Sequence, residues 1–207
     1  MLFLNKDVLF LIFEELKNDK KSLYSCLLVN RTWCITAVPI LWKNPGQYLL
    51  TDNAGSLFDV ILLHLSVESR DNLRNQGINL FTETYYKPPL FNYINFWRHL
   101  NLQLLESMIN EDNIKKSIVI RNELLNLFIN RNTKFISLYI PENFDHQLHN
   151  ISGAEHCFSD LEFLQCNEKT NQNILARISK SIKIMRFDNI SDGMNLNNSG
   201  FSKLIKP

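Results

Sequence analysis

The sequence predicts a mainly α-helical protein with an α/β C-terminal part. Over residues 4–130, apolar side chains mostly recur at the spacing of helices. After residue 130, three short apolar runs alternate with polar stretches, which is typical of short strands in a repeat array. We therefore expect a three-helix domain over residues 1–43, a helical middle region and linker over 44–130, and a short array of strand-containing repeats over 131–207.

The composition excludes several classes of protein. The chain has 207 residues, enough for one large or two small domains. Its 22 Lys and Arg residues nearly balance its 21 Asp and Glu residues, so no global charge favours nucleic acid or an anionic membrane as a partner. The longest strongly apolar run, residues 60–67, is far shorter than the roughly 20 residues of a membrane span.

The cysteines and the N-terminus indicate the compartment. The four cysteines are Cys26, Cys34, Cys157 and Cys166, and none belongs to a C-x-x-C pair. Such usage in a chain of this length indicates a reducing environment. The apolar start is interrupted by charges at residues 6 and 7, and no small-residue cleavage site follows it. We expect a cytoplasmic or nuclear protein, or one present in both compartments.

Residues 4–42 are predicted to form compact helices. Asn5 is expected to cap the first helix and Ser22 the second, whereas Pro39 is expected to separate the helices from Leu41 and Trp42. One apolar stripe of the first helix contains Val8, Leu9, Ile12, Phe13 and Leu16. A domain of about forty residues encloses so many large apolar groups only with difficulty. Excess apolar surface predicts a docking surface for a partner.

The middle region is predicted to contain short helices separated by turns. Asn44-Pro45-Gly46 and Asp52 to Ser56 mark a linker over residues 43–59, and Pro88-Pro89 marks a second boundary. Helices are expected over Phe58–Leu65, Ile94–Ile109 and Glu123–Ile129. The polar stretch Glu68–Leu80 is expected to continue as a second helix or as a turn.

The three C-terminal runs share the pattern L-x-x-L-x-L, the third of them loosely. They begin at residues 135, 161 and 182, a spacing within the range of leucine-rich repeats. A returning helix is expected over 173–179, and Asn189 follows the third run as an asparagine often does in such repeats. The x positions of this pattern point to the concave face. They nominate as substrate-facing residues Ser137, Tyr139, Phe163, Gln165, Ile184 and Arg186. The alternative is that these are exposed strand residues without a ligand.

The first forty residues resemble an F-box. About a dozen positions agree with that motif in order and spacing, and the main departure is Asn5, where proline is usual. Residues 87–93 and 151–157 resemble segments of a large fungal family of F-box proteins with degenerate C-terminal leucine-rich repeats. The resemblance then covers the whole chain, although only its first forty residues contain a specific motif. Because members of that family usually continue further, a shortened member or a fragment is expected.

The resemblance implies a non-catalytic role in a Skp–cullin–F-box ubiquitin ligase. The F-box would dock on the Skp adaptor, and through it on a cullin, while the repeats would hold a protein substrate that the sequence does not identify. The residues that it implies for adaptor docking are Leu4, Val8, Leu9, Ile12, Phe13, Leu16, Leu23, Cys26, Val29, Asn30, Arg31, Trp33, Leu41 and Trp42. Which of them form the domain core and which form the interface stays open.

Other functions remain as alternatives. An F-box scaffold without ubiquitination activity and a non-functional truncated member are two of them. A hydrolase or metal enzyme is the third, but the sequence contains no G-x-S-x-G, P-loop, H-E-x-x-H or G-x-G-x-x-G motif. A cluster of possible zinc ligands matches no common spacing and comprises His146, His149, His156, Cys157 and Cys166. We therefore predict no catalytic residue, no metal and no cofactor.

Overall fold

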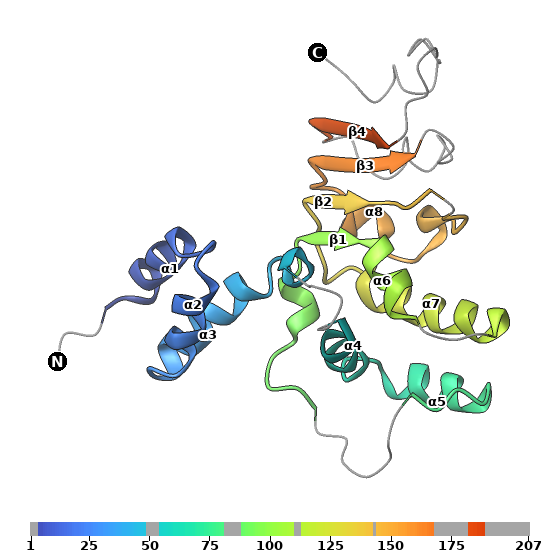
Figure 1. The fold of residues 1–207 in the computed structure, drawn as a ribbon, viewed down its shortest axis with the longest axis horizontal. Helices are drawn as coiled ribbons and strands as arrows, with labels where there is room; N and C mark the ends of the chain where they lie inside the picture. The colour runs from blue at the N-terminus through green and yellow to red at the C-terminus, as the bar shows by residue number, and fades with distance from the viewer. Residues whose placement is uncertain are drawn as a thin grey trace. The chain divides into compact units, whose positions relative to one another are not determined.

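The computed structural model describes residues 4–48, 54–80, 88–109, 113–142, 144–167 and 182–188. The described chain is mainly α-helical and contains a small parallel sheet, so the predicted fold class is confirmed at this level. It divides into two compact units (Figure 1). We call them the N-terminal unit (Met1–Tyr48) and the C-terminal unit (Leu49–Pro207).

From residue 4 on, where the structure describes it, the N-terminal unit consists of three α-helices and one 3-10 turn. Its elements are α1 (Lys6–Glu15), α2 (Lys20–Leu27), α3 (Arg31–Leu41) and η1 (Pro45–Tyr48). A polar side chain accepts a backbone N–H at the start of each α-helix: Asn5 at α1, Asp19 at α2 and Asn30 at α3.

Two local expectations for this unit were wrong. Asp19, not Ser22, caps α2, because its carboxylate accepts both the backbone N–H of Ser22 at 3.2 Å and the Ser22 hydroxyl at 2.6 Å. Pro39 lies inside α3 instead of ending it. A proline in a helix interior costs about 3 kcal/mol. Burial of a large apolar side chain contributes roughly 1.5–3 kcal/mol, and Val38, Ile40 and Leu41 around this proline are all buried.

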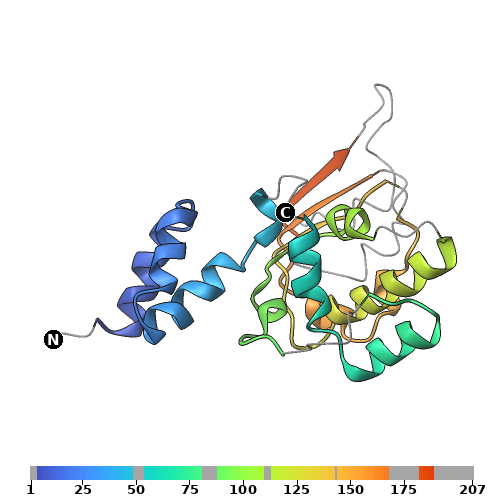
Figure 2. The same ribbon diagram turned by 60° about the horizontal axis from the view of Figure 1, so that its bottom comes forward.

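The helices of the C-terminal unit precede and separate its strands. They are α4 (Ala54–Leu62), α5 (Val67–Asn75), η4 (Tyr93–Phe96), α6 (Leu102–Met108), α7 (Ile114–Phe128), η5 (Leu148–Asn150) and α8 (Ala154–Cys157). Helix α4 begins inside the segment expected to be linker, and α7 is longer than the predicted 123–129. Helix α5 lies beside α7 (Figure 2), where Asn72 donates to the Glu123 carboxylate at 2.6 Å.

Among the described residues, the sheet contains four parallel strands in chain order. They are β1 (His99–Asn101), β2 (Ser137–Tyr139), β3 (Phe163–Asn167) and β4 (Ile184–Asp188). Each of the three predicted runs contains one strand. Each pair of neighbouring strands begins with the same two hydrogen bonds, in which one backbone carbonyl accepts from two successive N–H groups at the start of the next strand. The Arg98 carbonyl accepts from Ile136 and Ser137, the Ile136 carbonyl from Glu162 and Phe163, and the Glu162 carbonyl from Lys183 and Ile184.

Strand β1 was not predicted, because a continuous helix was expected from Ile94 to Ile109. Its segment Trp97-Arg98-His99-Leu100-Asn101-Leu102 has the spacing of the three C-terminal runs, with Trp in place of the first Leu. The parallel register aligns Leu100 with Leu138 of β2, and Leu138 with Leu164 of β3. The run at 97–102 is therefore the first member of the series.

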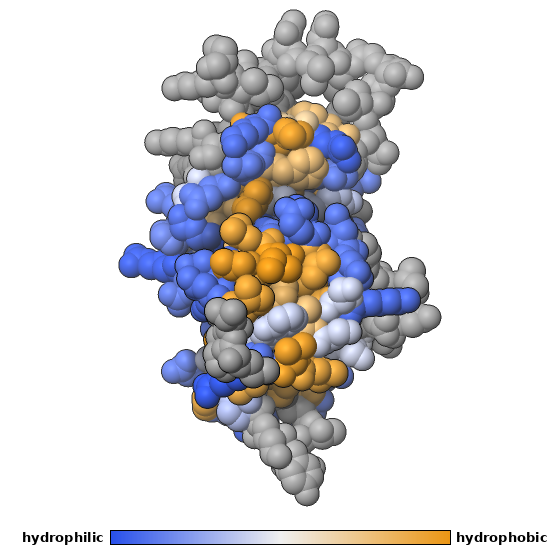
Figure 3. Space-filling view, turned by 90° about the vertical axis from the view of Figure 1, so that its left-hand side faces the viewer, coloured by the Kyte–Doolittle hydropathy of each residue, from blue (hydrophilic) through white to orange (hydrophobic). Residues whose placement is uncertain are grey.

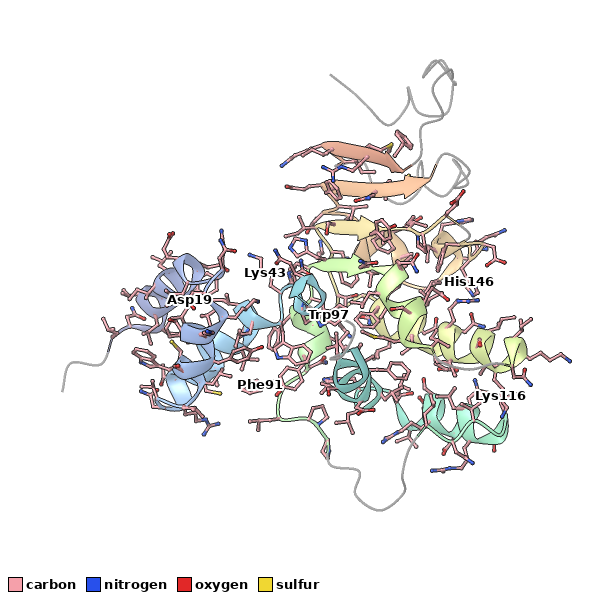
Figure 4. All side chains as sticks on the ribbon, viewed as in Figure 1. Asp19, Lys43, Phe91, Trp97, Lys116 and His146 are labelled. Atoms are coloured by element: carbon pink, nitrogen blue, oxygen red, sulfur yellow. The ribbon has the colours of Figure 1, made fainter. Side chains whose placement is uncertain are left out.

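The apolar positions of these segments form the core beneath the sheet. The buried residues at equivalent places are Trp97, Phe135 and Leu161 in the first column, Leu100, Leu138 and Leu164 in the second, and Leu102, Ile140 and Cys166 in the third. Trp97 (Figure 4) also packs on Phe128 of α7, with 4.6 Å between ring centroids. The predicted helix over 173–179 and Asn189 lie outside the described residues.

Candidate functional site

The N-terminal unit has a small core that holds its three helices together. The core comprises Leu9, Phe13, Leu23, Cys26, Ala37, Ile40 and Leu41. Five of these belong to the set nominated for adaptor docking: Leu9, Phe13, Leu23, Cys26 and Leu41. Their side chains are almost fully buried within the unit. They therefore hold the helices together, and little of their surface is accessible to a partner.

Three nominated residues lie at the boundary of this core. Leu16, Trp33 and Trp42 are partly buried and pack against it. Trp33 contacts Phe13 edge-to-face, with the ring centroids 5.3 Å apart. These side chains contribute to stability and still present part of their surface to solvent.

Four nominated apolar residues are exposed. They are Leu4, Val8, Ile12 and Val29. Four further exposed apolar side chains were missed from the sequence: Phe10, Leu11, Tyr24 and Leu28. We call these eight residues the apolar surface of the N-terminal unit. Figure 3 shows apolar side chains, in orange, gathered over this unit on the side that faces the viewer.

The apolar surface is large for a unit of this size. Leu28 is 88% exposed and Leu11 is 65% exposed, and it is the number of such side chains on one small unit, more than any single one of them, that is informative. Large exposed apolar patches on soluble proteins often mark interaction sites. The signal in the sequence was the uninterrupted run from Val8 to Phe13, because one face of a helix cannot bury six consecutive apolar residues.

The two nominated polar residues have different roles. Asn30 accepts the Trp33 N–H at 3.0 Å, so its side chain caps α3. Arg31 is the first residue of α3 and is exposed. Asn30 is thus explained by helix capping, whereas Arg31 is accessible to a partner.

The second candidate site is the outward face of the four-stranded sheet. The parallel register aligns Ser137, Phe163 and Ile184 in one row and Tyr139, Gln165 and Arg186 in the other. All six residues that the sequence nominated therefore lie together, and all are partly or fully exposed. Strand β1 adds His99 to the first row and Asn101 to the second. We call these eight residues the sheet face.

His99 and Asn101 were missed because β1 was assigned to a helix. The pattern W-x-x-L-x-L at 97–102 was the signal that would have found them. His99 belongs to the polar surface of the sheet, since its Nδ1 lies 2.8 Å from the Ser137 hydroxyl. A row of four strands at about 4.8 Å spacing extends roughly 14 Å, which is enough to contact several residues of an extended peptide.

The possible zinc ligands do not form a site in the described part of the chain. Within it, no three His, Cys, Asp or Glu side chains come together in a way that would hold a metal ion. His146 Nε2 lies 2.6 Å from the Asn122 side-chain oxygen. Burial raises the pKa of the Cys157 thiol to about 11, so at neutral pH this cysteine is a protonated side chain of the core.

The comparisons with known proteins identify no relative. No protein-family model matches the sequence, and no curated protein and no solved structure matches it.

Among the described segments, every helix falls short of the length and apolar character that crossing a membrane requires.

Proposed function

We propose that this chain is a substrate-recognition subunit of a Skp–cullin–F-box ubiquitin ligase. In this role the N-terminal unit docks on the Skp adaptor, and the sheet face of the C-terminal unit receives a protein substrate. The chain brings two partners together and catalyses no reaction itself.

The observation that carries the proposal is the apolar surface on a unit that already has its own core. Because Leu9 and Phe13 hold α1 to the other helices, Val8 and Ile12 on the same helix remain available. Burying such a side chain contributes roughly 1.5–3 kcal/mol. A few of them are enough to anchor a stable protein–protein interface.

The C-terminal unit supports the second half of the proposal. Its strands have the alternation expected of a repeat array, with apolar residues inside and chemically diverse residues outside. The sheet face includes two aromatic side chains, Tyr139 and Phe163, of the class enriched in protein interfaces. The repeats are thus proposed to be leucine-rich repeats of a degenerate kind.

Adaptor binding is tested by co-purification of the full chain with the Skp adaptor. We expect Val8→Gln combined with Ile12→Gln to weaken binding at least tenfold without loss of folding, because both side chains are exposed. Val67→Gln on α5 is the matched control, since Val67 is 64% exposed but lies in the other unit. Adaptor binding that is absent, or that is unchanged in the double variant, contradicts the proposal.

Ligase function needs a separate measurement. Cells that contain the full chain are compared with cells that contain the double variant, with and without inhibition of the cullin. A client that accumulates on inhibition only with the intact chain supports substrate recognition. Adaptor binding without any such client would instead identify a scaffold.

A further inference from the structure

We draw no further inference here: the strongest candidate, the hollow of about 450 Å³ between α6, α7 and the segment after β2 that Glu106, Glu142 and Asp145 help to line, is a cluster of acidic side chains for which nothing in the described part of the chain points to a ligand.

Discussion

Arg121 of α7 binds Glu106 of α6 through two parallel hydrogen bonds. Nε donates to Oε1, and Nη2 donates to Oε2 at 2.7 Å. Both side chains are less than one quarter exposed, and Glu106 is the main cause of a raised pKa of the Arg121 guanidinium. Two-pronged pairs of this kind are the stronger ion pairs of proteins, so this contact fixes α6, which follows β1 directly, to α7.

We predict that Arg121→Met lowers the free energy of unfolding by about 2 kcal/mol, because it leaves a partly buried Glu106 without its partner. Urea unfolding of the full chain, followed by tryptophan fluorescence, measures the change. Asp71→Asn is the control, since the pair of Asp71 with Arg74 is more than half exposed and should contribute less than about 0.5 kcal/mol. Equal effects of the two variants would contradict the importance of the Arg121 pair.

The cap of α3 predicts that two substitutions of the same residue differ in their effect on stability. Asn30→Ala removes the acceptor for the Trp33 N–H and should cost about 1 kcal/mol of stability. Asn30→Asp keeps an acceptor at the same position and should cost much less. Thermal unfolding of the two variants separates these cases. If both lose the same stability, the role of Asn30 as a cap is wrong.

Asp19 makes the stability of this unit dependent on pH. Its hydrogen bonds from the Ser22 hydroxyl and the Ser22 N–H lower the pKa of the carboxyl below its usual value. A group whose pKa is lower in the folded state contributes stability above its unfolded pKa and loses it as the pH falls through the folded pKa. The melting temperature should therefore fall as the pH is lowered from about 5 through the ordinary aspartate pKa of about 4 and below it, and Asp19→Asn should make that fall shallower. A pH profile identical to that of the parent would show that Asp19 does not contribute.

Two glycines predict opposite effects of the same substitution. Gly153 has φ 91°, and a Cβ there would lie 2.8 Å from the backbone carbon of Asn130. Gly153→Ala should therefore cost at least about 2 kcal/mol. Gly55 lies in α4, and a Cβ added to it would meet no atom of the described residues within 4 Å, so Gly55→Ala should add up to about 1 kcal/mol. Chemical denaturation compares the two variants, and a tolerated alanine at 153 would refute the argument.

The sequence predicts the helical N-terminal unit well but does not divide its residues between core and surface. Val8 and Leu9 are adjacent and similar in chemistry, yet Leu9 is buried and Val8 is exposed. Consecutive helical residues point about 100° apart, so the side on which the other helices pack decides the outcome. The spacing of one helix does not contain that information.

The sheet face shows the opposite case. The six residues nominated from the x positions lie together because parallel strands in register align equivalent positions. Strand β1 was not predicted, because the aromatic residues before it and the helical spacing of α6 after it made the segment 97–102 look like part of one helix. Tertiary pairing with β2 overrides the local preference there, as it often does for short segments.

The ladder of repeated hydrogen bonds from Arg98, Ile136 and Glu162 has a consequence for how the sheet opens. Because each strand is hydrogen-bonded to the strand before it in the chain, each one is stabilised only by contacts with its immediate neighbours. Within the described residues β2 and β3 each have two neighbours, whereas β1 and β4 each have one. In native-state hydrogen exchange the amides of the edge strands β1 and β4 should therefore exchange before those of the inner strands β2 and β3.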